Sequence, residues 1–112
     1  IEAGNSTQAI EFLESSLDYY SESADSYYRL AEASNKLTRY NDAVRYSRQA
    51  LSFETGGNTD KAKIFFELGL ANQMLENKGE ACSAFESASY GSFKQPSEYK
   101  IEFELKCERT SP

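Results

Sequence analysis

Two stretches of the sequence, "RYNDAVRYSRQAL" at residues 39–51 and "NKGEACSAFESAS" at residues 77–89, share one pattern of small residues. Aligned, they place Ala43 on Ala81 and Ala50 on Ala88, at a spacing of 38 residues. Intervals of one, three and four residues put these positions on one stripe of an α-helix. A third copy of the stripe lies 34 residues before the first and consists of Ala9, Ile10, Leu13, Ser16 and Leu17.

A second helical pattern lies between these copies. The stretch "YYRLAEASNKL" at residues 27–37 and the stretch "IFFELGLANQML" at residues 64–75 each carry an aromatic residue, then a Leu followed by a small residue, and a Leu near the end. Their separation is again 38 residues. The two patterns alternate along the chain, so the repeating unit is a pair of helices, which we call A and then B.

This unit resembles the tetratricopeptide repeat. The family asks for an aromatic and a Leu-Gly or Leu-Ala pair on helix A, and for two small residues flanking a bulky one on helix B. The matching residues are Tyr27, Leu30 and Ala31, then Phe65, Leu68 and Gly69, then Ala43 and Ala50, and finally Ala81, Phe85 and Ala88. Small residues let two helices cross closely while the aromatic fills the space beside them. Ser47 and Ser16 depart from the pattern.

The resemblance implies an all-α fold: a right-handed α-α superhelix of antiparallel helix pairs, with about six helices in a single domain over residues 1–112. The expected elements are helix B of a truncated first repeat at 6–19, a second repeat at 24–54 (helices 24–37 and 41–54), a third repeat at 59–90 (helices 59–76 and 78–89), and a terminal capping helix at 97–108. A solenoid that starts on a lone helix B indicates a fragment of a longer protein.

In chain order, the second and third copies of the stripe are 38 residues apart, whereas the first and second are 34 apart. The four extra residues lie near "SFETGGNTDK" at residues 52–61. One helical turn takes about 3.6 residues, so we expect one extra turn at this junction. Gly56 and Gly57 are expected to end the earlier helix, and Asn58 or Thr59 to cap the next.

The segment "EYKIEFELKC" at residues 98–107 alternates apolar and charged residues, which by period alone favours a strand. A strand needs a partner for its backbone, and no other stretch alternates for more than a few residues. Tyr99 also lies 34 residues after Phe65, where a helix A would place its aromatic. We therefore favour a helix, and a strand that pairs with a second copy is the alternative.

Composition excludes several classes of function. The net charge is −6, with 18 acidic and 12 basic residues, which disfavours nucleic acids and anionic lipid surfaces. No apolar run approaches the roughly 18 residues that a membrane span needs, so we expect no direct membrane insertion. The chain has no His, the commonest general base and zinc ligand. We expect no cofactor, no metal site and no catalytic residue.

Tetratricopeptide solenoids usually bind extended peptides on the concave face, which is lined by the A helices. The resemblance assigns to this face Asp25, Tyr28, Glu32, Asn35 and Lys36 from the first complete pair, and Lys63, Phe66, Leu70, Gln73 and Met74 from the second. For the charged members, a solvated face without a partner is the favoured interpretation. Phe66, Leu70 and Met74 form an apolar stripe that contacts either a partner or the terminal helix. The Lys and Asn clamp that chaperone-binding members use for a peptide carboxylate is absent, because those positions hold Tyr28, Glu32, Phe66 and Leu70.

Cys82 lies early in one expected helix and Cys107 late in the next. Antiparallel helices bring these positions to the same end, so a disulfide is geometrically allowed, and for a loop of this size it would add about 3 kcal/mol of stability. Two buried free thiols are the alternative. A disulfide would indicate a periplasmic or other extracytoplasmic location, and free thiols a cytoplasmic one.

These observations predict a non-catalytic module that binds a peptide or protein segment. Two alternatives stay open from the sequence: a structural segment that forms homodimers through exposed solenoid ends, and a sensor or docking arm of a larger enzyme.

Overall fold

The computed structural model describes residues 23–107, and this part of the chain is helical without any strand. Its α-helices are α2 (Ala24–Lys36), α3 (Tyr40–Phe53), α4 (Asn58–Met74), α5 (Lys78–Ser87) and α6 (Lys94–Tyr99), with a 3-10 turn η1 (Gly91–Phe93) before α6 and a π-helical turn η2 (Lys100–Glu104) after it. The described residues thus hold five α-helices, against about six predicted for the whole chain. The helix predicted at 6–19 lies outside the described residues.

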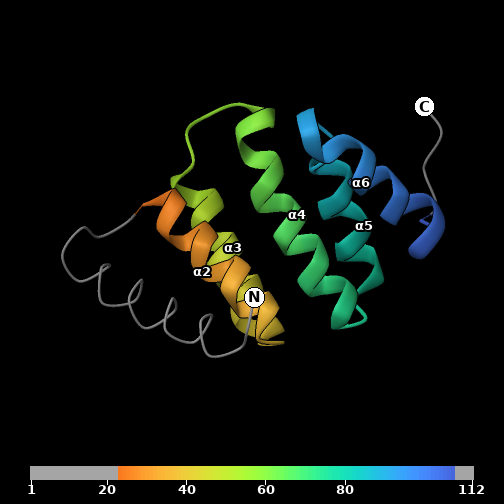
Figure 1. Cartoon of the computed structure of the whole chain (residues 1–112), viewed down its shortest axis with the longest axis horizontal. Coiled ribbons are helices and arrows are strands. Elements are labelled where there is room, and N and C mark those ends of the chain that lie inside the picture. Colours follow the sequence, from red (N-terminus) through yellow and green to blue (C-terminus); the bar gives the residue numbers. More distant parts are fainter. Residues whose placement is uncertain (1–22, 108–112) are drawn as a thin grey trace.

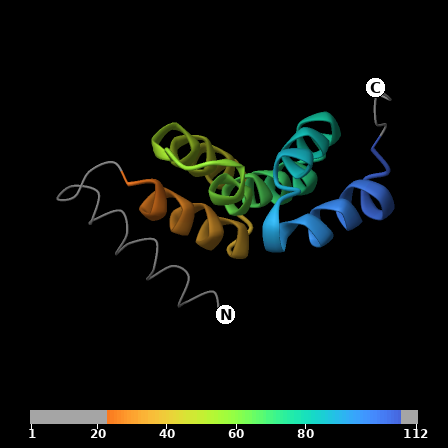
Figure 2. The same cartoon turned by 90° about the horizontal axis from the view of Figure 1, so that it is seen from above.

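Consecutive helices pack as pairs and the pairs stand side by side. The most extensive contacts join α2 to α3 and α4 to α5, and α3 in turn packs on α4. Figure 1 shows the pairs in chain order, with α6 beside α5 at the far end. Seen from above, α2, α4 and α6 form one row and α3 and α5 the other (Figure 2). This arrangement confirms the predicted all-α helical-repeat fold.

The turns inside the two pairs have the same geometry. Thr38 and Glu76, which lie 38 residues apart, both adopt left-handed backbone conformations with φ of 60° and 63°. After each of them, a backbone N–H closes the helix end: Arg39 donates to the Ser34 carbonyl at 2.8 Å, and Asn77 donates to the Asn72 carbonyl at 2.9 Å. A left-handed residue followed by such a bond is a common way to end a helix. The two pairs are therefore equivalent units.

The first pair is closed by small residues and by an aromatic that the family pattern did not predict. Ala43 and Ala50 are fully buried where α3 crosses its neighbours. Ser47, which stands where a bulky residue was expected, is also fully buried. The bulk comes instead from Tyr46, which is 6% exposed and stacks on Tyr27 at 6.3 Å between ring centroids.

The second pair is built around Phe85. This ring is fully buried with Ala81 and Ile101, and Phe66 and Leu70 pack against them. Gly69 lets the ring approach, because a Cβ added to Gly69 would lie only 2.7 Å from Phe85 Cε1. The Leu-Gly pair on helix α4 is therefore a requirement of this crossing.

The junction between the pairs differs in detail from the prediction. Helix α3 ends at Phe53, and the N-cap of α4 is Gly57, one residue before the predicted Asn58. The reason is the side chain of Asp60, whose carboxylate accepts a hydrogen bond from the Gly57 N–H at 3.1 Å. Helix α4 has 17 residues, against 13 in α2. It contacts η1, where Thr59 at its N-terminal end lies beside Gly91.

The bounds predicted for the terminal helix, residues 97–108, are wrong. Helix α6 begins at Lys94, and after Tyr99 the backbone widens into η2, which ends at Glu104. In the wide turn the Leu105 N–H donates to the Lys100 carbonyl at 2.8 Å and the Cys107 N–H to the Ile101 carbonyl at 2.8 Å. In a regular helix Cys107 would share a stripe with Tyr99 and Phe103. The wide turn moves it to the side of Ile101 and Leu105 instead.

Replacing Ala43 with Leu tests the crossing in the first pair. The added atoms have no room at a fully buried position, so we expect the free energy of unfolding to fall by roughly 1–3 kcal/mol. Asn41→Leu, at an exposed position of the same helix, is the matched control and should stay within about 0.5 kcal/mol. Urea unfolding measures both; equal stability of the two variants would remove Ala43 from the core.

Candidate functional site

The side of the molecule lined by α2, α4 and the terminal segment α6–η2 is the candidate functional site, and we call it the A-face (Figure 2). All the side chains assigned from the resemblance lie on α2 or α4. The face has two parts. One lies between α2 and α4 and is polar, and the other lies between α4 and the terminal segment and is largely apolar.

Charged groups and a tyrosine meet at one end of the polar part. The Lys63 ammonium lies 4.8 Å from the centre of the Tyr28 ring and 4.0 Å from an Asp25 carboxylate oxygen. Asp25 also pairs with Arg29 at 2.9 Å. Burial raises the pKa of Tyr28 to about 12, with the nearby carboxylates, Glu32 first, adding to it. The hydroxyl of Tyr28 is therefore a neutral hydrogen-bond donor at physiological pH.

A buried carboxylate lies in the middle of the polar part. Glu67 on α4 is 8% exposed, and Asn35 on α2 holds it: the Asn35 amide donates to Glu67 Oε1 at 2.8 Å and to the Glu67 backbone carbonyl at 3.0 Å. Burial raises the pKa of the Glu67 carboxyl by more than the hydrogen bond from Asn35 lowers it, and the charge of Glu32 raises it further. These bonds join the two repeats across the face.

Sequence reasoning missed Glu67. The signal was present, because a single acidic residue stands inside the apolar run "IFFELGL". A charge at such a position is seldom buried without a partner. That partner was already among the assigned residues as Asn35, 32 positions earlier in the chain.

The predicted apolar stripe on α4 is divided. Phe66 and Leu70 are half-buried and pack against the core of Ala81, Phe85 and Ile101. The Phe66 ring also meets the Phe85 ring at 5.3 Å and the Phe93 ring at 5.4 Å. Of the two alternatives predicted for this stripe, Phe66 and Leu70 therefore follow the one in which they pack within the protein. Met74 is different and is 57% exposed.

Polar side chains connect α4 to the terminal segment beside this apolar contact. The Gln73 amide donates to Glu104 Oε1 at 2.9 Å, and the Lys100 ammonium reaches the same oxygen at 2.9 Å. The hydrogen bond from Gln73 and then the one from Lys100 lower the pKa of the Glu104 carboxyl. Gln73 therefore positions the terminal segment.

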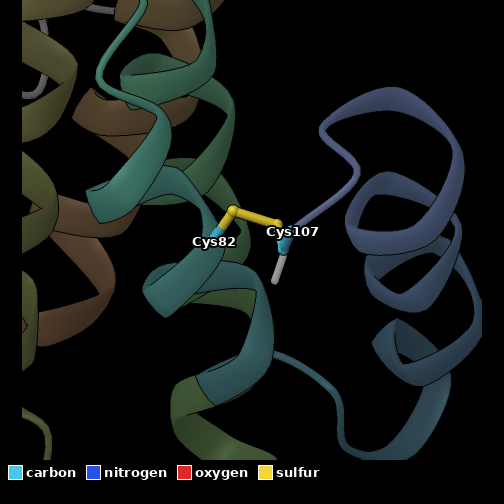
Figure 3. Close-up of a disulfide and its surroundings, with 2 residues drawn as sticks. All are labelled: Cys82 and Cys107. Carbon is cyan, nitrogen blue, oxygen red and sulfur yellow. A yellow bond between two sulfur atoms is a disulfide. The ribbon is translucent and has the colours of Figure 1, made fainter. Parts of the chain in front are cut away.

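Cys82 on α5 and Cys107 after η2 are joined by a disulfide, with 5.9 Å between their Cα atoms. Figure 3 shows the bond reaching from α5 to the chain that follows the terminal segment. Lys106, with φ of 52°, turns the backbone immediately before Cys107. The disulfide thus ties the chain just after the terminal segment to α5, in the row formed by α3 and α5.

Within residues 23–107 no group of three or more His, Cys, Asp or Glu side chains is arranged to hold a metal ion. No helix in that part of the chain is long and apolar enough to cross a membrane.

Comparison with protein-family models finds a match to the first helix pair. Residues 24–55, which cover α2 and α3, match the family model described as tetratricopeptide repeat. The match confirms the predicted resemblance for this pair. No curated protein matches the chain, and no solved structure matches it either.

Glu67 makes stability depend on pH. Because its pKa is raised by folding, the folded state holds the proton more readily than the unfolded chain does, and stability falls as pH rises above the unfolded value of about 4.3. Glu67→Gln should remove this fall and stabilise the protein at pH 7, since an uncharged amide keeps an oxygen for Asn35. Urea unfolding between pH 4 and pH 7 measures the effect.

The control for this experiment is Glu86→Gln, at an exposed position on α5. It should leave the pH profile unchanged. An identical slope in the original chain and in Glu67→Gln would show that Glu67 titrates alike in the folded and unfolded states.

Proposed function

We propose that this chain, which carries a tetratricopeptide repeat at residues 24–55, is a non-catalytic module that binds a peptide or protein segment along its A-face. Tetratricopeptide repeats are typically protein-interaction modules, and the matched pair α2–α3 contributes α2 to that face. The observation that carries the proposal is the single row of α2, α4 and α6 (Figure 2).

The state of the assigned residues favours a division of labour on this face. Tyr28, Asn35 and Gln73 have partners within the protein, so they support the surface. Lys36 and Met74 are exposed, and Glu32 stands beside the buried Glu67. We propose that Glu32, Lys36 and Met74 meet the partner first, through charge and a flexible apolar side chain.

The Cys82–Cys107 disulfide favours an oxidising, extracytoplasmic compartment, because disulfides are rare where thiols are kept reduced. A peptide partner of the A-face would then be met in the same compartment.

A charge reversal on the A-face tests the proposal. Glu32→Lys should abolish or strongly reduce capture of the partner by the immobilised protein, because it reverses the charge on the proposed surface. Glu86→Lys makes the same change on α5, in the row of α3 and α5 and away from the A-face, and should leave capture unchanged. Mass spectrometry quantifies the proteins retained by each variant; retention that falls equally in both would contradict an A-face site.

Self-association through a solenoid end is a second candidate, because Tyr99 and Phe103 are 55% and 63% exposed on the terminal segment. Their rings lie 5.3 Å apart and form one apolar patch. If this patch joins two copies, light scattering will show a dimer whose dissociation constant rises at least about tenfold in Phe103→Ser, the loss of roughly 1.4 kcal/mol. A monomer at all concentrations would end this candidate.

A further inference from the structure

We propose that residues 94–107 form a cover over the apolar part of the A-face, locked by the Cys82–Cys107 disulfide and released by a dithiol reductant. Release would withdraw Ile101 from Phe85 and Leu70, and so extend the apolar surface that is open to a partner beside Met74. The use of this surface rests on the proposed function, whereas the release itself does not.

The cover packs on the apolar cluster that α4 and α5 share. Ile101, which is 1% exposed, lies with Ala81 and Phe85, and Leu105 packs against the same cluster as Phe66 and Leu70. Met74, one helical turn beyond Leu70, is already exposed. With the cover removed, Leu70 joins Met74, four residues further on, on one helix face. Phe66 keeps its ring contacts with Phe85 and Phe93, which lie outside the cover.

Non-covalent contacts hold the cover at few points. Ser97 and Ile101 are fully buried and Leu105 is half-buried, whereas Tyr99 and Phe103 are exposed. Lys100 and Glu104 pair with each other inside the segment, and Gln73 reaches Glu104 from α4. The π-helical backbone of η2 lacks the regular hydrogen bonds of an α-helix, and such turns often mark functional positions.

The disulfide is placed where a lock has most effect. Cys107 is the last residue of the cover, three residues after the end of η2, and its partner Cys82 belongs to α5, outside the cover. A surface hollow of about 380 Å³ adjoins the bond and is lined by Lys78, Gly79, Cys82, Ser83 and Glu86. Cys82 is half-buried and lines this hollow, so we expect a small dithiol to reach its sulfur.

The chemistry is thiol–disulfide exchange. A thiolate of the reductant attacks the Cys82 sulfur, the Cys82–Cys107 bond breaks, and Cys107 leaves as a thiolate that takes up a proton. The second thiol of the reductant then attacks the mixed disulfide and frees Cys82, which is also protonated. Two electrons pass to the protein, and the reductant ends as a disulfide.

Hydrogen exchange of the whole chain, with and without dithiothreitol, tests the cover. We expect the amides of Leu105 and Cys107, which bond within the segment, to exchange at least about tenfold faster after reduction. The amides of α2 and α3 should keep their rates, because that pair has its own core. The double variant Cys82→Ser with Cys107→Ser should exchange like the reduced protein and should not respond to dithiothreitol.

A second readout reports what is uncovered. The dye ANS binds exposed apolar surface, so its fluorescence should rise on reduction and rise less in Leu70→Gln. Unchanged exchange in residues 94–107 would overturn the proposal, and so would equal acceleration in α2 and α3, which would make the disulfide a staple of the whole domain. Neither result bears on peptide binding by the oxidised A-face, which the Glu32→Lys experiment addresses separately.

Discussion

The close approach of Gly69 to the Phe85 ring is the contact on which the rest of the structure depends. A Cβ on Gly69 would stand 2.7 Å from the ring, inside van der Waals contact, so only glycine allows α4 and α5 to cross at this distance. In the first pair the matching position is Ala31, which is fully buried, as are Ala43 and Ala50. Each helix buries its apolar stripe in such a crossing, because a single helix offers no second apolar surface against which the stripe can pack.

The crossings also decide what the A-face is made of. Because α3 packs behind α2 and α5 packs behind α4, the helices α2, α4 and α6 form one row (Figure 2). Helix α4 then meets α2 on one flank, where Asn35 holds the buried Glu67. On the other flank, Phe66 and Leu70 pack against the cluster that contains Ile101 of the terminal segment. One helix thus separates a polar part from an apolar part. The polar part is open and the apolar part is covered.

The helices and their pairing could be predicted from the sequence because small residues at helical spacing admit few other packings. Three features could not. Tyr46 replaces the bulk missing at Ser47 from the neighbouring position, which depends on how Tyr27 and Phe53 stack. The burial of Glu67 depends on Asn35, which is distant in sequence. The π-helical turn depends on tertiary packing, because the alternating pattern of residues 98–107 favours a strand by its period and gives no sign of a widened helical turn.

Two glycine substitutions test the crossing most directly. Gly69→Ala should lower the free energy of unfolding by about 1–3 kcal/mol, because the buried ring must shift although alanine favours helix. Gly79→Ala, with nothing within 4 Å of its added Cβ, should raise it by roughly 0.5–1 kcal/mol. Urea unfolding of the two variants gives the comparison. Opposite signs are the predicted result, and stabilisation by both substitutions would contradict a crossing that requires glycine.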